Sequence, residues 1–211
     1  MSSLLDPSET FLSLAENVGL DVRLRKSVQR LGHVRPTLVQ SKCLPLALTS
    51  GRDLLVRAKT GSGKTLAYCL PLLQKIIQTK DDNPRDSVVR AVVLVPTREL
   101  CSQVYTTLQS LTYYCNDIIS VAVLSAGARG RSEKAQQEMA RQQAMLRDRP
   151  DVLVATPAGL LAHIRAGDVD LKSSVQTLVV DEADLVLSFG RFLGNLGLIY
   201  IFKCMHKDFD D

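Results

Sequence analysis

The sequence predicts an α/β domain built on a doubly wound parallel sheet with helices on both faces. Three observations support this fold class. Short apolar runs of strand length alternate with helical patterns along most of the chain. A glycine-rich segment joins one of these runs directly to a helix. Polar motifs follow the ends of several apolar runs, and parallel sheets collect their chemistry at the carboxyl ends of strands.

The composition is that of an ordinary globular protein. The chain has 211 residues, of which 45% are hydrophobic and 23% charged, enough for one α/β domain with a sizeable core. A net charge of +4 permits a polyanionic partner without requiring one. The five cysteines show no metal-ligand spacing, so we expect reduced thiols, an intracellular location and no structural metal. No apolar run is long enough to span a membrane, and the N-terminus is not a secretory signal.

The first segments of the chain are expected to be a lead-in and two helices. Residues 1–19 read as a loose lead-in. An amphipathic helix follows, because apolar residues recur at three- and four-residue steps at Leu20, Leu24, Val28 and Leu31. Pro36 then fixes a turn, and a second helix runs to about Leu48.

A phosphate-binding loop is predicted after the apolar run at residues 54–56. The loop consists of Ala58, Lys59, Thr60, Gly61, Ser62, Gly63, Lys64 and Thr65. It opens a predicted helix that reaches Thr79, and the helix N-terminus favours an anion. Lys64 is expected to contact the outer phosphates, and the Thr65 hydroxyl is expected to ligate magnesium. Ala58 stands where the generic pattern has its first glycine.

Two further strands and a helix are predicted in the middle of the chain. Residues 90–95 read as a buried strand of the parallel-sheet kind, apolar from Ala91 to Val95, which ends in Pro96-Thr97-Arg98. Thr97 is a good helix cap, so we expect a helix from there to about Cys115. Residues 118–124 read as the next strand.

The last predicted elements again alternate. Residues 129–149 read as a polar surface helix with only a thin apolar stripe. Residues 151–155 form a strand that ends in Thr156-Pro157, and a helix continues through Ile164. Residues 175–180 form another strand.

This strand delivers a pair of carboxylates, Asp181 and Glu182, at its carboxyl end. Beside a phosphate loop, Asp181 is expected to hold the metal, and Glu182 to orient and deprotonate a water that attacks the terminal phosphate. The alternative is a helix N-terminus, where acidic residues are favoured for their effect on the helix dipole.

Together these segments resemble the DEAD-box ATP-dependent RNA helicases. That family is named after the sequence Asp-Glu-Ala-Asp, which occurs here as Asp181-Glu182-Ala183-Asp184. The similarity runs from about Leu20 to Gly190, in the family's motif order. It includes the family's alanine in the phosphate loop, the string Pro96-Thr97-Arg98-Glu99-Leu100, and the adenine motif at Gly32, Pro36, Thr37 and Gln40. The resemblance implies a RecA-like P-loop NTPase domain over residues 20–190 that uses ATP and Mg2+.

The resemblance also implies roles for individual residues. Gln40 would read adenine, and Arg35 would contact the nucleotide from the same motif. Lys64, Asp181 and Glu182 would serve catalysis, with Glu182 as the base. RNA would be held through its backbone, whatever its sequence, by Pro96, Thr97, Arg98, Thr156 and Pro157.

Several positions depart from the family pattern. The aromatic residue that usually stacks on adenine lies seventeen positions before Gly32, where this chain has Ala15. The usual aromatic after Gly32 is His33. Ser125-Ala126-Gly127 stands where a Gly-Gly pair is common, and the motif that begins at Thr156 lacks its frequent arginine.

The resemblance stops after Gly190. Residues 191–211 form a divergent tail in which the Ser-Ala-Thr strand and second helicase domain of the family are not recognisable. We expect a truncated splice form, or a gene model read past an exon end, that hydrolyses ATP weakly or not at all. Because the missing strand is central, an empty slot would leave backbone groups unpaired. We therefore expect residues 198–202 to fill it as a substitute strand.

The functional prediction is the ATP-binding half of an RNA helicase, which couples RNA-stimulated ATP hydrolysis to duplex unwinding or RNP remodelling. One alternative is a module that binds nucleotide or RNA without turnover. The other is an unrelated P-loop phosphotransferase, although no site for a small phosphate acceptor is evident. Ser188-Phe189-Gly190 resembles a nucleolar subgroup that serves large ribosomal subunit assembly, which implies pre-ribosomal particles as partners and a nuclear or nucleolar location.

Overall fold

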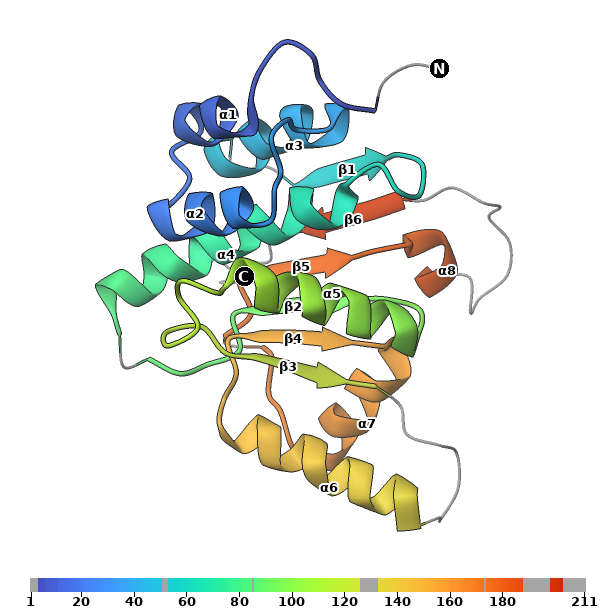
Figure 1. Ribbon diagram of the computed structural model, residues 1–211. Helices are drawn as coiled ribbons and strands as arrows, with labels where there is room; N and C mark the ends of the chain where they lie inside the picture. The colour runs from blue at the N-terminus through green and yellow to red at the C-terminus, as the bar shows by residue number, and fades with distance from the viewer. Residues whose placement is uncertain are drawn as a thin grey trace, which may run out of the picture.

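The fold is a six-stranded sheet with helices on both faces, as the sequence predicts (Figure 1). The computed structural model describes residues 4–50, 53–84, 86–125, 133–172 and 174–187, and the backbone of residues 198–202. The strand order is β1-β6-β5-β2-β4-β3. The strands are β1 (Leu54–Arg57), β2 (Ala91–Leu94), β3 (Val121–Leu124), β4 (Val152–Ala155), β5 (Thr177–Val180) and β6 (Leu198–Phe202).

Eight helices lie in the described part of the chain. They are α1 (Phe11–Asn17), α2 (Val22–Arg30), α3 (Leu38–Thr49), α4 (Lys64–Asp82), α5 (Arg98–Leu111), α6 (Glu133–Arg147), α7 (Pro157–Ala166) and α8 (Ala183–Leu187). None of the helices in these residues is long and apolar enough to cross a membrane. The predicted helices are all present, and α4 continues past the expected end at Thr79 to Asp82.

Two hydrophobic clusters cover the two faces of the sheet. In the larger cluster, helices α1, α2, α3, α4 and α5 pack against one face of the sheet. In the smaller cluster, α6 and α7 pack against the other face. Val93 belongs to the larger cluster and its neighbour Val92 to the smaller, because successive residues of a strand point to opposite faces. The polar helix α6 lies at the surface, as predicted, and contributes only Leu146 to a buried cluster. Its expected first residues, 129–132, lie outside the described part of the chain.

The expectation that residues 1–19 form a loose lead-in is wrong for the segment around α1. Thr10 caps this helix by accepting a hydrogen bond from the Ser13 N–H. Phe11, Leu14 and Ala15 are buried in the larger cluster. The helix has only 7 residues, too few for a convincing helical period, and it is held by its apolar contacts with the rest of the fold.

The substitute strand predicted at residues 198–202 is confirmed. β6 lies between β1 and β5 and runs antiparallel to both, whereas β5, β2, β4 and β3 pair in parallel. The sheet is therefore parallel except for this strand. β6 supplies hydrogen-bond partners to the facing edges of β1 and β5, which would otherwise be unpaired. The rest of the divergent tail, residues 191–197 and 203–211, lies outside the described residues.

A buried ion cluster ties the amino-terminal ends of the strands together. Asp151, just before β4, has a side chain only 2% exposed, and its Oδ1 lies 2.9 Å from both Arg90 Nη1 and Lys80 Nζ. Its Oδ2 accepts a hydrogen bond of 3.0 Å from the Ser120 N–H. Arg90 also contacts Asp86, whose side chain is 52% exposed. One carboxylate thus pairs with two buried cations, one from α4 and one from the start of β2.

We predict that Asp151→Asn lowers the free energy of unfolding by about 3–5 kcal/mol, because it removes the ion-pair partner of the buried Lys80 and one of the two partners of Arg90. The matched control is Asp86→Asn, which removes an exposed partner of Arg90 and should cost at most about 1 kcal/mol. Urea unfolding of the two variants measures both losses. Equal losses would show that the burial of Asp151 contributes nothing to the cluster.

Candidate active site

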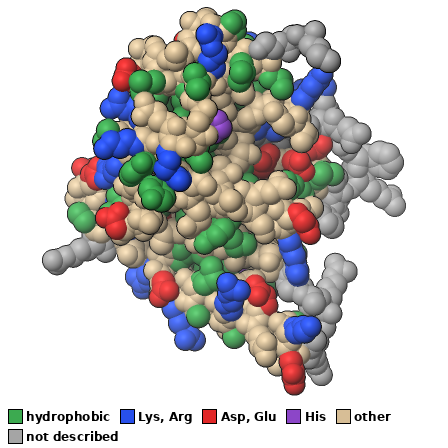
Figure 2. Space-filling model, viewed as in Figure 1, with side chains coloured by type: hydrophobic (Ala, Val, Ile, Leu, Met, Phe, Trp, Pro, Cys, Tyr) green, Lys and Arg blue, Asp and Glu red, His purple; other side chains and the backbone are tan. Residues whose placement is uncertain are grey.

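The motifs singled out in the sequence meet at one edge of the sheet. The phosphate loop follows β1, Pro96 follows β2, Thr156 follows β4 and Asp181 follows β5, so all four lie where the arrowheads of Figure 1 end. Figure 2 shows acidic side chains gathered beside a hollow in the surface, close to α8 and the end of β5. The structure therefore brings together the residues that the sequence assigned to one site.

The phosphate loop turns through two glycines in the left-handed region. Gly61 has a φ of 78° and Gly63 a φ of 83°, a conformation that other residues adopt only with strain. The buried Lys64 ammonium donates hydrogen bonds to the carbonyls of Ala58 at 3.0 Å and Lys59 at 3.1 Å. The Ser62 hydroxyl is buried without a partner in the described residues. A free hydroxyl, an ammonium group and a helix N-terminus fit a phosphate group.

Gln40 ties the adenine motif to the phosphate loop. Its amide oxygen accepts a hydrogen bond of 2.8 Å from the Thr37 N–H, and the Thr37 hydroxyl accepts one of 3.3 Å from the Gln40 N–H. This is a capping box at the start of α3. The Gln40 amide nitrogen donates to the Gly63 carbonyl at 3.1 Å. Gln40 therefore positions the loop, and its reading of adenine stays a prediction.

Arg35, the other residue expected to contact the nucleotide, is exposed. Its Nη1 donates to the Pro7 carbonyl at 2.6 Å. In this arrangement the guanidinium group secures the segment before α1.

Asp181 lies buried between α4 and the end of β5. Its Oδ2 accepts a hydrogen bond of 3.1 Å from the Tyr68 hydroxyl, and its Oδ1 accepts one of 2.9 Å from the Glu182 N–H. Burial raises the pKa of Asp181, whereas these hydrogen bonds and the Lys64 charge oppose the rise. Thr65, the other predicted metal ligand, lies three residues before the same tyrosine on α4. The two predicted metal ligands thus share one neighbour.

Glu182 adopts an unusual backbone conformation for a glutamate, with a φ of 50°. Its pKa is raised by burial and by the negative charges of Asp181 and Asp184, and lowered by Lys64. A carboxylate with a raised pKa is a better proton acceptor than an ordinary one. The left-handed conformation turns the chain away from the direction of β5 at this residue. Strained backbone of this kind is often found at functional sites.

The residues predicted to contact RNA lie at two helix N-termini on the same edge. The Thr97 hydroxyl caps α5 by accepting a hydrogen bond from the Leu100 N–H, and Thr156 caps α7 by accepting one from Gly159. Arg98 is exposed at the start of α5. Pro96 and Pro157 are half-buried beside the two caps. Two positive helix ends and an exposed guanidinium group can receive a phosphate backbone.

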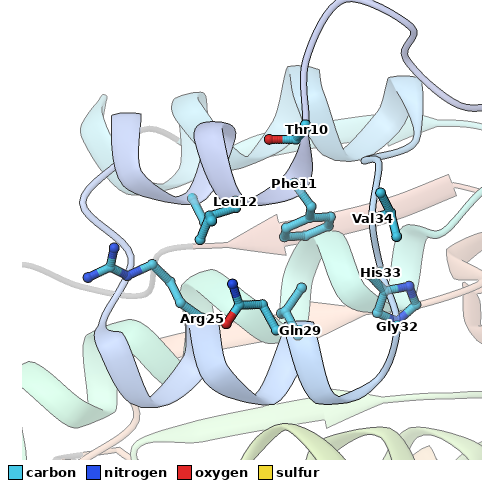
Figure 3. Close-up of a pocket in the computed structure, with 10 residues that line it drawn as sticks. Thr10, Phe11, Leu12, Arg25, Gln29, Gly32, His33 and Val34 are labelled. Atoms are coloured by element: carbon cyan, nitrogen blue, oxygen red, sulfur yellow. The ribbon is translucent and has the colours of Figure 1, made fainter.

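A cavity of about 370 Å³ lies between α1 and α2, next to the adenine motif (Figure 3). Ala15, which stands where the family has its stacking aromatic, is 1% exposed and lines this cavity. Phe11 and His33 line it as well, with ring centroids 6.2 Å apart. Figure 3 shows Phe11 on the α1 side and His33 on the loop after α2. The two departures from the family pattern therefore occur at the same place in the fold.

The sequence reasoning missed Tyr68 and the contact between Gln40 and Gly63. Tyr68 lies three residues after Thr65, so both occupy one face of α4. That spacing was the only available signal, because Tyr68 and Asp181 are 113 residues apart in the chain.

We predict that Gly63→Ala destabilises the fold more than Gly61→Ala. Both replacements place an alanine in the left-handed conformation, which lowers the free energy of unfolding by about 1–2 kcal/mol. Only at Gly63 would the new Cβ lie 2.5 Å from Gln40 Nε2 and 2.9 Å from Thr37 Oγ1, whereas Gly61 has open space. Urea unfolding of the two variants gives the difference. Equal losses would mean that the Gln40 amide moves aside freely.

Comparison with curated proteins finds ATP-dependent RNA helicases. The chain is 43% identical over 190 residues to the probable ATP-dependent RNA helicase ddx56 of Dictyostelium discoideum, covering 90% of this chain and 26% of that protein. It is 44% identical over 176 residues to the ATP-dependent RNA helicase dbp9 of Aspergillus clavatus, covering 83% of this chain and 26% of that protein. The chain thus spans about a quarter of the length of these relatives.

Solved structures of helicases share the fold. The yeast DEAD-box splicing factor Prp28 superposes with a TM-score of 0.69 at 29% identity, over 90% of this chain and 42% of that one. A hypothetical ATP-dependent RNA helicase from Sulfolobus tokodaii gives 0.65 at 33% identity, over 81% and 44%. Residues 37–199 match the family described as DEAD/DEAH box helicase, which is well over half of the sequence. The chain belongs to the DEAD/DEAH box helicase family.

Proposed function

We propose that this chain is the ATP-binding domain of an ATP-dependent RNA helicase, which couples RNA-stimulated ATP hydrolysis to unwinding of RNA duplexes or remodelling of RNPs. The observation that carries the proposal is the carboxylate pair at the end of β5, near the phosphate loop. Tyr68, on the helix that the phosphate loop opens, donates a hydrogen bond of 3.1 Å to Asp181, which supports the closeness of the carboxylates to the loop. A general base beside a phosphate loop is what hydrolysis of a terminal phosphate requires.

Each residue of the site has a defined part in this proposal. The loop N–H groups and Lys64 would hold the phosphates of ATP, and Lys64 would exchange the carbonyls of Ala58 and Lys59 for phosphate oxygens. Thr65 and Asp181 would hold Mg2+, whose charge would offset that of the phosphates. Glu182 would accept the proton of the attacking water, a role that its raised pKa favours.

Base recognition would fall to Gln40 and Arg35. After its bonds to Thr37 and Gly63, the Gln40 amide keeps one N–H and one lone pair, which suits the donor and acceptor of an adenine edge. Arg35 would have to leave the Pro7 carbonyl to reach a nucleotide. Ala15 offers no ring for stacking, so the base would depend more on these polar contacts.

RNA would bind across the edge formed by Pro96, Thr97, Arg98, Thr156 and Pro157. Helix N-termini and an arginine contact phosphates rather than base edges, so binding would be independent of sequence. Residues 188–190, on which a nucleolar location and pre-ribosomal partners rest, lie outside the described part of the chain. We extend the proposal to those partners and that location on their resemblance alone.

The second candidate is a module that binds nucleotide or RNA without turnover. It is supported by the antiparallel strand β6, which lies between β1 and β5, where the Ser-Ala-Thr strand of the family is expected. Measurement of ATP hydrolysis with and without RNA separates the two. Hydrolysis that RNA stimulates supports the helicase, and tight ATP binding without hydrolysis supports the module.

We predict opposite defects for two substitutions in the site. Glu182→Gln keeps its shape but cannot accept a proton, so ATP binding should persist while hydrolysis falls by about 10²–10⁴-fold. Lys64→Ala removes a charge-assisted contact and should weaken ATP binding by roughly 10- to 100-fold. Binding by fluorescence and single-turnover hydrolysis measure the two quantities. Normal hydrolysis by Glu182→Gln would remove Glu182 from the role of base.

We predict that Arg98→Ala weakens RNA binding uniformly across sequences. The lost contact is to phosphate, so the slope of the logarithm of affinity against the logarithm of salt concentration should decrease in magnitude by about one. Titration of two RNAs of unrelated sequence over a range of salt concentrations tests this, with Arg165→Ala, an exposed arginine in the last turn of α7, as the control. A loss confined to one of the RNAs would point to base readout instead.

A further inference from the structure

We propose that Tyr68 is a positioning residue for the metal site, whose hydroxyl group fixes the side chain of Asp181 for magnesium. The inference rests on the proposed function, because it concerns a residue assigned to the ion. It adds a residue that the phosphate-loop and DEAD motifs do not contain.

The position of Tyr68 follows from the helix that carries it. Tyr68 lies one turn after Thr65 on α4, so the two side chains share a face of the helix. It is 1% exposed, which fixes its ring among the core residues of the larger cluster. Its hydroxyl group therefore has few alternatives to the polar groups at the end of β5.

The Tyr68 hydroxyl group supplies a hydrogen-bond donor to the Asp181 carboxylate. A phenol offers one donor and can also accept. The donor is directed at Asp181 Oδ2, at 3.1 Å. Tyr68 thus links the DEAD motif to the helix that begins at the phosphate loop.

This arrangement fixes the orientation of the Asp181 carboxylate through both of its oxygens. The Glu182 N–H holds Oδ1 at 2.9 Å and the Tyr68 hydroxyl holds Oδ2 at 3.1 Å. Each oxygen keeps a lone pair that can face a cation. Partners that orient a ligating carboxylate typically change metal affinity by about 10- to 100-fold when they are removed.

A purely structural role would need only the ring. Phenylalanine fills nearly the same volume, so Tyr68→Phe keeps the packing of α4 and removes only the donor to Asp181. The carboxylate would remain buried with the Glu182 N–H as its one remaining donor among those described here. The substitution therefore separates positioning of the carboxylate from support of the core.

The experiment is a titration of Mg2+ against binding of a fluorescent ADP, repeated in EDTA, for the 211-residue chain and its Tyr68→Phe variant. We expect equal ADP affinity in EDTA and about 10- to 100-fold weaker apparent Mg2+ affinity for the variant. The matched control is Tyr105→Phe on α5, which should leave both quantities unchanged. An unchanged Mg2+ dependence in Tyr68→Phe overturns the inference.

A double-mutant cycle with Asp181→Asn tests the route of the effect. If Tyr68 acts through Asp181, then Tyr68→Phe should change Mg2+ affinity little in the Asp181→Asn background. Full additivity overturns the positioning role. The proposed function fails separately: an unmodified chain that binds ADP no better with Mg2+ than with EDTA would refute the metal site itself, and the inference with it.

Discussion

The candidate site depends on the hydrogen-bonded ladder that β6 makes with β1 and β5. β1 carries the phosphate loop and β5 carries Asp181, yet the two strands are not neighbours. The distance between loop and carboxylates is therefore set by the one strand between them. β6 runs against the direction of its neighbours, but an antiparallel ladder still satisfies the backbone groups on both sides. The hydrogen bond from Tyr68 to Asp181 ties the same two parts together from the side of α4.

Buried charges are paired differently at the amino-terminal and carboxyl ends of the strands. At the amino-terminal edge, Asp151 is balanced by two buried cations and serves stability. At the carboxyl edge, burial raises the pKa of Asp181 and Glu182, with Lys64 only partly opposing it. In the proposed function, these carboxylates would meet a cation beside the phosphate loop, which would offset the cost of their burial.

Local patterns in the sequence predicted most of the fold and the location of the site. Buried parallel strands read as unbroken apolar runs, and Thr97 and Thr156 mark helix starts by their side-chain chemistry. The pattern failed at α1, because seven residues are too few to show a period and the helix is held by contacts with distant segments. It also could not show that Tyr68 meets Asp181, since nothing local links residues 113 positions apart. Such pairings follow only from the strand order.

Gln40 holds the phosphate loop in the fold and is the residue proposed to read the base. Its amide has two N–H groups and two lone pairs, and the structure uses one N–H for Gly63 and one lone pair for Thr37. The remaining pair can meet an adenine edge without breaking either bond. A base held there would restrain the amide that holds Gly63, and the close approach of Gly63 to Gln40 leaves little room for independent movement. In the proposed function, base recognition and the shape of the phosphate loop would therefore be coupled through a single amide group.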